Sequence, residues 1–249
     1  MEQNKMEELR DTLKEGEIKE IFAEHHPADI AAAITGLPDG EISTVGRGVK
    51  SSELAPVMEE LEEDEQIRIL AEKSLDEIVE IFSFMPADDV TDLMGAMPVN
   101  KRKQLLALMR SGKAERIKEL LGYGPETAGG IMTKEYLALR ESLNTRQAVE
   151  KIKEIGPRTE VIESIFVVND KKELQGTVDL REVLSAPDGK TLGELAEKNF
   201  FWVTPDVDQE EVARAVARYD LPVVPVVSRK KRLLGIITFD DIIDVIEDE

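Results

Sequence analysis

Residues 165–179, IFVVNDKKELQGTVD, and residues 224–238, VPVVSRKKRLLGIIT, decide how the second half of this chain folds. Each stretch has a β-branched apolar run, a polar turn and a second apolar run, which predicts two strands joined by a hairpin turn. We call these two copies the hairpin repeat. A helical segment precedes each copy, from Leu143 to Ala148 and from Val207 to Val212. Because each unit of strands and helices is too small to be stable alone, we expect the two units to pack on each other across their sheets.

Residues up to about Leu121 have a different pattern, with short amphipathic helices separated by prolines. Apolar residues recur there with the i, i+3, i+4, i+7 spacing of one helix face, and this group of four returns at a constant interval, which we call the helical repeat. Such a period predicts stacked helical units that form a short superhelix, because one unit cannot bury its own apolar face. The three groups are Ile30, Ala33, Ile34 and Leu37; Leu54, Val57, Met58 and Leu61; and Ile78, Ile81, Phe82 and Met85.

The composition limits the chemistry. Of the 249 residues, 41% are hydrophobic but only 4% are aromatic, so the cores must be aliphatic. The absence of cysteine excludes disulfides, thiolate metal sites and a cysteine nucleophile, and it fits a reducing compartment. No uncharged apolar run approaches the roughly 18 residues of a membrane helix, and Glu2 and Glu7 stand where a signal peptide is basic. We therefore expect a soluble, cytosolic chain.

The net charge is -20, from 32 Lys and Arg against 52 Asp and Glu. A surface this acidic repels nucleic-acid backbones and anionic lipid headgroups, which argues against both as partners unless the fold hides a basic patch. A cation is the partner that this charge favours. No nucleophile, base and orienting group occur in the spacing of a hydrolase motif, so we expect no enzyme activity.

A short motif ends the second strand of each predicted hairpin. It reads GIITFDD in the second copy, from Gly235 to Asp241, and GTVDLRE in the first, from Gly176 to Glu182. The second copy resembles the signature of CBS domains, regulatory modules that bind adenosyl ligands, whereas the first has Asp for the hydroxyl residue and Glu for the final Asp. In this signature, glycine permits the close approach of a strand, the hydroxyl caps the next helix and the carboxylate accepts ribose hydroxyls. The resemblance implies a nucleotide pocket at Arg181, Gly235, Thr238 and Asp241.

The junction string YGPETAGGIMTKEY, from Tyr123 to Tyr136, lies between the helical repeat and the paired modules. It resembles the junction in the cytosolic part of the MgtE family of magnesium transporters, and the Pro-Ala-Asp helix starts at Pro27 and Pro86 resemble that family's N domain. The resemblance implies an all-α superhelical repeat domain followed by an α/β tandem CBS pair. The implied domains are the helical superhelix over 1–121, a hinge over 122–130, the first CBS domain over 131–187 and the second over 188–249.

The resemblance also implies that Mg²⁺ binds between the N and CBS domains and across a CBS dimer, which locks a closed state. Carried over residue by residue, the N-domain ligands are Asp88 and Asp92, which we expect to face outward from one helix. On the CBS side, we expect Asp208 and Glu210 at a helix start near Asp220. Because Mg²⁺ takes oxygen ligands and keeps several waters, one or two carboxylates from each surface suffice. The full CBS set is Asp208, Glu210, Asp220, Asp241, Asp244 and Glu249.

Each acidic residue also has an ordinary interpretation, as part of a solvated helix face or as compensation for a helix dipole. Asp208 is a good N-cap in its own right. Asp241 has two functional interpretations, ribose contact and Mg²⁺ ligation, and the sequence does not separate them.

The leading hypothesis is a cytosolic Mg²⁺-sensing regulatory module that gates an MgtE-type transporter or channel by Mg²⁺-dependent domain closure, on the cytoplasmic side of the cell membrane. Its partners would be a second copy, bound through the CBS domains, and the membrane domain of the same transporter, which is absent from this chain. Mg²⁺ is the expected ligand, with ATP as a second. The alternative is a stand-alone CBS protein that binds adenine nucleotides and regulates an enzyme. A third hypothesis is a scaffold whose helical repeat binds a partner protein.

Overall fold

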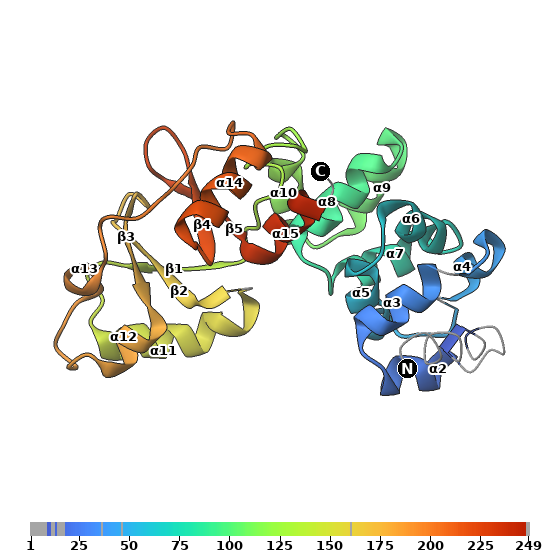
Figure 1. The fold of residues 1–249 in the computed structure, drawn as a ribbon, viewed down its shortest axis with the longest axis horizontal. Coiled ribbons are helices and arrows are strands. Elements are labelled where there is room, and N and C mark those ends of the chain that lie inside the picture. The colour runs from blue at the N-terminus through green and yellow to red at the C-terminus, as the bar shows by residue number, and fades with distance from the viewer. Residues whose placement is uncertain are drawn as a thin grey trace. The chain divides into compact units, whose positions relative to one another are not determined.

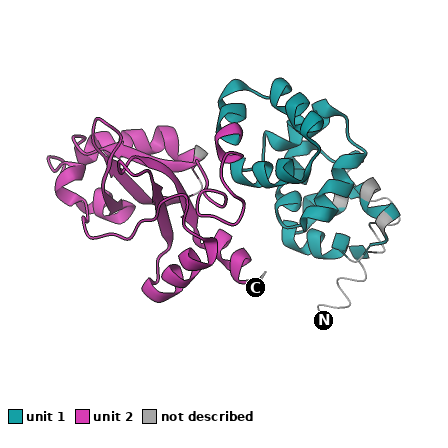
Figure 2. Cartoon of the chain, turned by 90° about the horizontal axis from the view of Figure 1, so that it is seen from above, with its two compact units in different colours: residues 1–117 teal, residues 118–249 magenta. Residues whose placement is uncertain are grey.

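The structure is a computed structural model that describes residues 9–10, 13, 18–35, 37–45, 47–159 and 161–247. Contacts between residues divide the chain into two compact units, residues 1–117 and residues 118–249 (Figure 2). This division falls inside one helix, a few residues before the expected boundary at Leu121. No helix in the described ranges is long and apolar enough to cross a membrane.

Unit 1 is helical and unit 2 contains the described strands (Figure 1). The helices of unit 1 are α2 (Ile18–Glu24), α3 (Pro27–Thr35), α4 (Asp39–Val45), α5 (Ser51–Glu59), α6 (Glu63–Ala71), α7 (Leu75–Phe82), α8 (Ala87–Ala96), α9 (Val99–Leu108) and most of α10 (Ser111–Leu120). Unit 2 has β1 (Tyr136–Arg140), α11 (Thr145–Ile155), the 3-10 turn η1 (Gly156–Arg158), β2 (Val161–Val168), β3 (Leu174–Asp179), α12 (Leu180–Ser185), α13 (Leu192–Leu195), α14 (Gln209–Tyr219), β4 (Val223–Val227), β5 (Leu233–Thr238) and α15 (Phe239–Glu247).

The helical repeat forms the core of unit 1. Every apolar residue of its three groups is buried, and these residues lie in or directly after α3, α5 and α7. These helices stack in order, α3 on α5, α5 on α7 and α7 on α9, while α4, α6 and α8 form a second stack beside them. Each repeat is therefore a pair of helices, and the predicted superhelix of stacked units is confirmed.

Local sequence signals set the helix boundaries in unit 1. Pro27 begins α3, where its missing N–H costs nothing. Ser74 caps α7 in a reciprocal capping box: its hydroxyl accepts from the Glu77 N–H at 3.3 Å, and the Glu77 carboxylate accepts from the Ser74 N–H at 2.8 Å. Helix α7 thus satisfies N–H groups of its first turn locally and leaves its apolar face to the neighbouring repeats.

The two copies in unit 2 have the same hairpin register. In the first copy β2 pairs antiparallel with β3, and Val167 lies opposite Gly176. In the second, β4 pairs antiparallel with β5, and Val226 lies opposite Gly235. The two pairs occupy equivalent positions of the hairpin repeat, so the sequence repeat is a structural repeat. β1 adds a parallel strand to the first hairpin.

Each copy also contributes a segment to the hairpin of the other. Thr133, before β1, bridges Ile236 in β5, and Glu197, before the second copy, bridges Thr177 in β3. A core that contains Phe166 and Val168 from the first copy and Ile236 from the second lies between them. The expected packing of the two copies on each other is confirmed, and their exchanged segments make unit 2 a single body.

The signature glycines permit this exchange. A Cβ atom on Gly235 would lie 2.7 Å from the backbone oxygen of Thr133, and one on Gly176 would lie 2.6 Å from the backbone oxygen of Glu197. Both distances are too short for any side chain. The close strand approach that the sequence predicted for these glycines is therefore present in both copies.

The segment expected to be a hinge, residues 122–130, is tied by its backbone to unit 2. The N–H of Ala128 donates to the Val207 carbonyl at 2.7 Å, and that of Gly129 donates to the Pro205 carbonyl at 3.0 Å. Thr127 and Asp208 form a β-bridge. The segment is thus a docked connection within unit 2, which the sequence could not reveal because its partners lie much further along the chain, at the start of the second copy.

Candidate functional site

The second signature ends β5 with a reciprocal pair of polar side chains. One carboxylate oxygen of Asp241 accepts hydrogen bonds from the Thr238 hydroxyl at 2.7 Å and from the Thr238 N–H at 2.9 Å. The Asp241 N–H points back to the hydroxyl at 3.5 Å, the outer limit for a bond. Burial raises the pKa of Asp241 above its ordinary value, and the Thr238 hydrogen bonds oppose this shift. The motif therefore caps α15 and fixes one carboxylate oxygen of Asp241.

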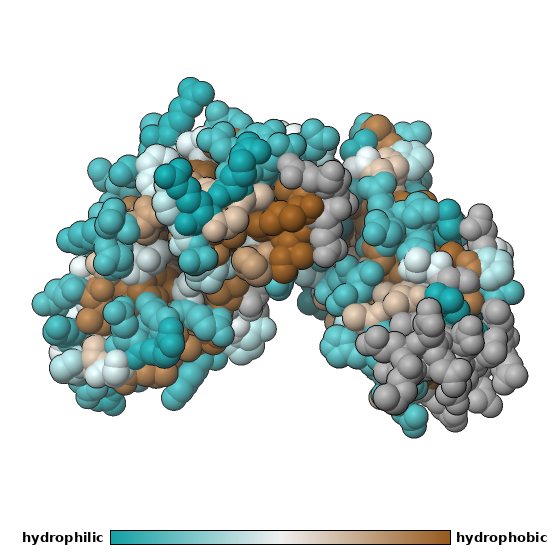
Figure 3. All heavy atoms as spheres, viewed as in Figure 1, coloured by the Kyte–Doolittle hydropathy of each residue, from teal (hydrophilic) through white to brown (hydrophobic). Residues whose placement is uncertain are grey.

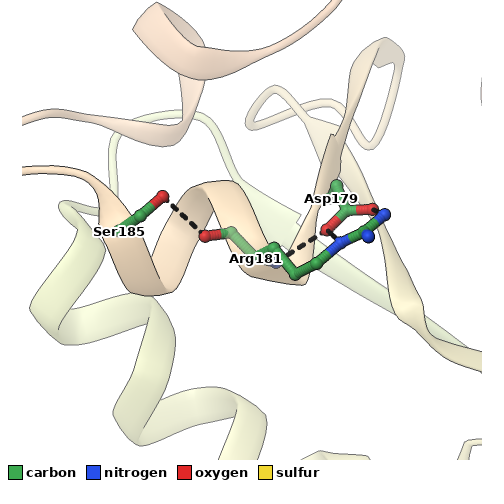
Figure 4. Close-up of polar contacts among 3 residues, drawn as sticks. All are labelled: Asp179, Arg181 and Ser185. Carbon is green, nitrogen blue, oxygen red and sulfur yellow. Dashed lines mark hydrogen bonds and ion pairs between the residues drawn. The ribbon is translucent and has the colours of Figure 1, made fainter.

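The first signature also caps the helix that follows it, but with a different pair of residues, Asp179 and Arg181 (Figure 4). Asp179 is the N-cap of α12 and accepts from the Arg181 N–H at 2.7 Å. The Arg181 side chain also donates to both oxygens of Asp179, at 3.0 and 2.9 Å. The hydrogen bonds from the Arg181 side chain and backbone lower the pKa of Asp179 to about 2. This carboxylate is ionised and fully engaged at neutral pH.

The two signatures present opposite chemistry to a ligand. In the second copy, the buried Thr238 hydroxyl is bonded to one oxygen of Asp241, and the second oxygen of this carboxylate has the chemistry to accept from ribose hydroxyls. In the first copy, Arg181 is an exposed guanidinium, which suits a phosphate but is already paired to Asp179. Arg181 belongs to α12, which packs on α11, whereas Thr238 ends β5 just before α15, which packs on α14. A pocket that uses both residues remains a prediction.

The acidic residues of α14 lie at both ends of that helix. Asp208 is the N-cap and accepts from the Glu210 N–H at 2.9 Å. Glu210 pairs with Arg214, one turn along, at 3.2 Å. Asp220 is the C-cap, in a left-handed conformation with φ 51°. The 11 helical residues between Asp208 and Asp220 place these two caps about 18 Å apart. The expected proximity of Asp208 and Glu210 to Asp220 is therefore wrong.

Asp88 and Asp92 share a helix but not an environment. Both lie on α8, four residues apart, as expected. Asp92 is exposed, but Asp88 is only 6% exposed, so the expectation that both face outward is wrong for Asp88. Asp88 lies in the first turn beside Ala87, which is buried. A carboxylate there also interacts favourably with the helix dipole.

The last helix separates the remaining acidic residues. Asp244 is exposed on α15, one turn after the largely buried Asp241. Glu249 lies outside the described residues, and so does its neighbour Asp248. No group of three or more His, Cys, Asp or Glu side chains that could hold a metal ion occurs in the described ranges.

Helix α15 has an exposed apolar stripe that was not predicted from the sequence. Phe239, Ile243 and Ile246 are exposed, with Ile246 at 51%, while Ile242 and Val245 of the same helix are buried. Figure 3 shows hydrophobic colour over this helix. The i, i+4, i+7 spacing of the three residues could have predicted a second apolar face.

Two protein-family models match the chain, in agreement with its two units. The model of the MgtE intracellular N domain matches residues 25–126, and the CBS domain model matches residues 128–189 and 192–248. Among proteins of known function, the chain is 39% identical over 133 residues to the magnesium transporter MgtE of Thermus thermophilus and 38% identical over 136 residues to that of Enterococcus faecalis. These matches cover 53% and 55% of this chain, and only 30% of the length of each relative.

Two solved structures match nearly from end to end. One is the soluble part of a magnesium transporter, with 30% identity, a TM-score of 0.85, and coverage of 100% of this chain and 99% of that one. The other is the cytosolic domain of the Mg²⁺ channel MgtE in complex with ATP, with 31% identity, a TM-score of 0.87, and coverage of 95% and 98%. At these identities the likeness extends beyond the fold to common descent.

Proposed function

Because this chain belongs to the MgtE family, with that family's N domain and CBS pair, we propose that it is the cytosolic, Mg²⁺-sensing regulatory part of an MgtE-type magnesium transporter or channel. The observation that supports this proposal best is the match along both units to the cytosolic part of a Mg²⁺ channel. The family resemblance and the fold class that the sequence predicted are confirmed by the same matches.

The proposed mechanism is conformational. Two carboxylates about 4 Å apart repel by about 4 kcal/mol at an effective dielectric constant of about 20, so acidic surfaces on the two units separate without a cation. Mg²⁺ converts this repulsion into bridging, since it takes oxygen ligands from both sides. Because the ion binds the closed arrangement better, its concentration sets the closed population. Asp92 on α8 of unit 1 and Asp244 on α15 of unit 2 are exposed carboxylates that we propose as Mg²⁺ ligands, each on its own unit.

Small-angle X-ray scattering tests the proposal. We expect Mg²⁺ to reduce the radius of gyration of the parent chain much more than NaCl of equal ionic strength, which only screens. The variants Asp92→Asn and Asp244→Asn should weaken this response, whereas Asp76→Asn, an exposed aspartate on α7, should not. An equal response of the parent to both salts would contradict Mg²⁺ sensing.

We propose that α15 also joins two copies of the chain into a homodimer through the CBS pair. Its stripe of Phe239, Ile243 and Ile246 is exposed in the single chain. Covering these apolar side chains with a partner would lower the free energy of the assembly. A dimer of this kind would place the α15 helices of the two copies next to each other.

The second candidate function is adenine-nucleotide binding at the second signature. The geometry of Thr238 and Asp241 favours it, and a relative with the same fold was crystallised with ATP. We expect at most one site per chain, because the first signature carries Asp179 and Glu182, and additional carboxylates near a triphosphate are unfavourable without Mg²⁺. Calorimetry with ATP, ADP and AMP should detect one site, weakened by Arg181→Gln but not by Arg214→Gln. Tight binding at two sites would contradict this assignment.

A further inference from the structure

The hairpin turns of the two copies meet in unit 2. We call residues 169–173 and 228–232 together the double turn. Leu174, next to the first turn, donates its N–H to the Lys231 carbonyl at 2.8 Å, and Leu233 donates to the Lys172 carbonyl at 3.3 Å. Glu173 and Arg232 form an antiparallel bridge between the turns. Two segments that are far apart in the sequence are thus held side by side by backbone hydrogen bonds.

The double turn gathers positive charge in an acidic chain. It contains two carboxylates, Asp170 and Glu173, and six cations, for a net charge of +4 in a chain that carries -20. Arg140 approaches Asp170 to 3.5 Å, and Glu173 accepts a hydrogen bond from Asn169. All six cationic side chains are exposed, and none of them forms an ion pair within the described part of the chain. The six are Lys171, Lys172, Arg229, Lys230, Lys231 and Arg232.

Two of these lysines have the same unfavourable backbone conformation. Lys172 has φ 62° and Lys231 has φ 56°, and the two positions correspond in the hairpin repeat. Glycine or asparagine normally occupies the left-handed region, which costs other residues about 1 kcal/mol or more. The chain therefore has lysine in both turns where glycine would be more stable. Stability does not explain the two lysines, but a role for their charge does.

Trp202, the single tryptophan of the chain, lies at the edge of the double turn. The ammonium of Lys231 lies 5.6 Å from the centre of the Trp202 ring, and Trp202 is 40% exposed. An indole beside exposed cations can insert at a membrane–water interface, where tryptophan is enriched. Trp202 also reports on the polarity around the double turn by its fluorescence.

We propose that the double turn binds the anionic phospholipid headgroups of a bilayer surface. The attraction amounts to about 1 kcal/mol for each Lys or Arg close to such a surface. It falls off over a Debye length of about 8 Å at physiological ionic strength, so a flat bilayer that touches the double turn feels its cations more than the acidic residues behind them. The choice of a bilayer rests on the proposed function as part of a membrane transporter.

The test uses the complete chain, without Mg²⁺, and vesicles of phosphatidylcholine with or without phosphatidylserine. We expect co-sedimentation and a blue shift of Trp202 emission only with phosphatidylserine, and release of the chain as NaCl is added. The variant Lys172→Gly with Lys231→Gly removes two cations and relieves two strained positions, so it should fold at least as well as the parent. Its affinity should fall at least tenfold, since each lost cation lowers binding about fivefold.

The run Lys101, Arg102 and Lys103 on α9 provides the matched control. Its triple replacement by glutamine should leave vesicle binding within twofold of the parent. The proposal would be overturned if this control lost vesicle binding as much as the double-turn variant does. It would also be overturned if vesicle binding did not depend on phosphatidylserine, or if the chain bound duplex DNA or single-stranded RNA but not vesicles. Since Mg²⁺ is absent, failure of Mg²⁺-dependent compaction would not change this outcome, and the two proposals can be tested separately.

Discussion

Asp179 and Thr238 occupy the same position in the two copies, and they end their strands with different polar contacts. Thr238 donates its hydroxyl to the Asp241 carboxylate, whose pKa is raised by burial. Asp179 forms a fully ionised pair with Arg181. The residue type at this one position thus decides whether the strand ends in a hydroxyl–carboxylate pair or in an ion pair.

The Arg181 side chain lowers the pKa of Asp179. In Arg181→Gln, we expect the pKa of Asp179 to rise from about 2 towards its usual value of 3.8, but to stay below it, because the backbone N–H remains. NMR titration of the Asp179 carboxyl measures this, with Arg214→Gln as the control. Since the folded pKa is lowered, the pair stabilises the fold above about pH 4, and this contribution is lost as the pH falls towards 2. An ordinary Asp179 pKa in the parent would contradict the ion pair.

Asp241 has the opposite pH dependence. Its folded pKa is raised, so its contribution to stability is fully present in acid, below the unfolded pKa, and is lost as the pH rises through the folded value. Asp241→Asn retains an oxygen that can accept from Thr238 but cannot ionise. We expect this variant to gain stability over the parent at neutral pH and not in acid, as measured by urea unfolding followed through Trp202. Asp76→Asn, at an exposed position on α7, should change little. A gain that is independent of pH would exclude burial of the Asp241 charge as its cause.

The conformation of the 122–130 segment depends on close contacts between its own backbone atoms as well as on its hydrogen bonds. Gly130 has no positive φ, but any Cβ atom there would collide with the backbone oxygens of Gly124 and Pro125. The segment folds back on itself tightly and pairs with residues 205–208. Its glycines therefore provide space, and they do not make the segment a free hinge.

Gly130→Ala should destabilise unit 2 by about 1–3 kcal/mol, because the backbone must move to accept the methyl group. The matched control is Gly95→Ala in α8, where an added Cβ meets nothing within 4 Å. This control should stabilise unit 1 by about 0.5–1 kcal/mol, since alanine favours the helix. Thermal unfolding of both variants measures the difference. Equal effects would show that helix and loop propensity, and not space, govern the two sites.

At the scale of the whole molecule, charge and apolar surface are distributed unevenly. A chain of net charge -20 keeps an apolar stripe exposed on α15 and a cationic double turn on unit 2. Scattered apolar residues on a surface need no explanation, but three at helical spacing form a continuous face. These two surfaces are where we expect the chain to meet a second copy and a bilayer.

The homodimer proposal predicts that Ile243→Glu converts the chain to a monomer. The new carboxylate would lie in the centre of the stripe and would face its own symmetry copy, where it would be desolvated. Sedimentation equilibrium measures the mass. Leu108→Glu, which changes an exposed leucine on α9, is the control and should remain a dimer. A parent chain that is monomeric at high concentration would refute the homodimer itself.

Elements whose cause is local or periodic could be predicted from the amino-acid sequence. The helical repeat identified the buried face of each helix pair, and the hairpin repeat identified the hairpins, their equivalence and their glycines, because side-chain periodicity follows from helix and strand geometry. The family resemblance also came from a contiguous string between Tyr123 and Tyr136.

Contacts between residues that are distant in the sequence depend on how the chain packs in three dimensions. This packing buries Asp88, although Asp88 and Asp92 are only one helical turn apart. It places Asp208 and Asp220 at opposite ends of α14. It also docks the expected hinge on residues 205–209. It also joined two turns into one cationic surface that neither turn forms alone. Such contacts depend on how the copies exchange segments and pack. A one-dimensional pattern does not contain that information, because the same periodicity is compatible with several arrangements of the packed units.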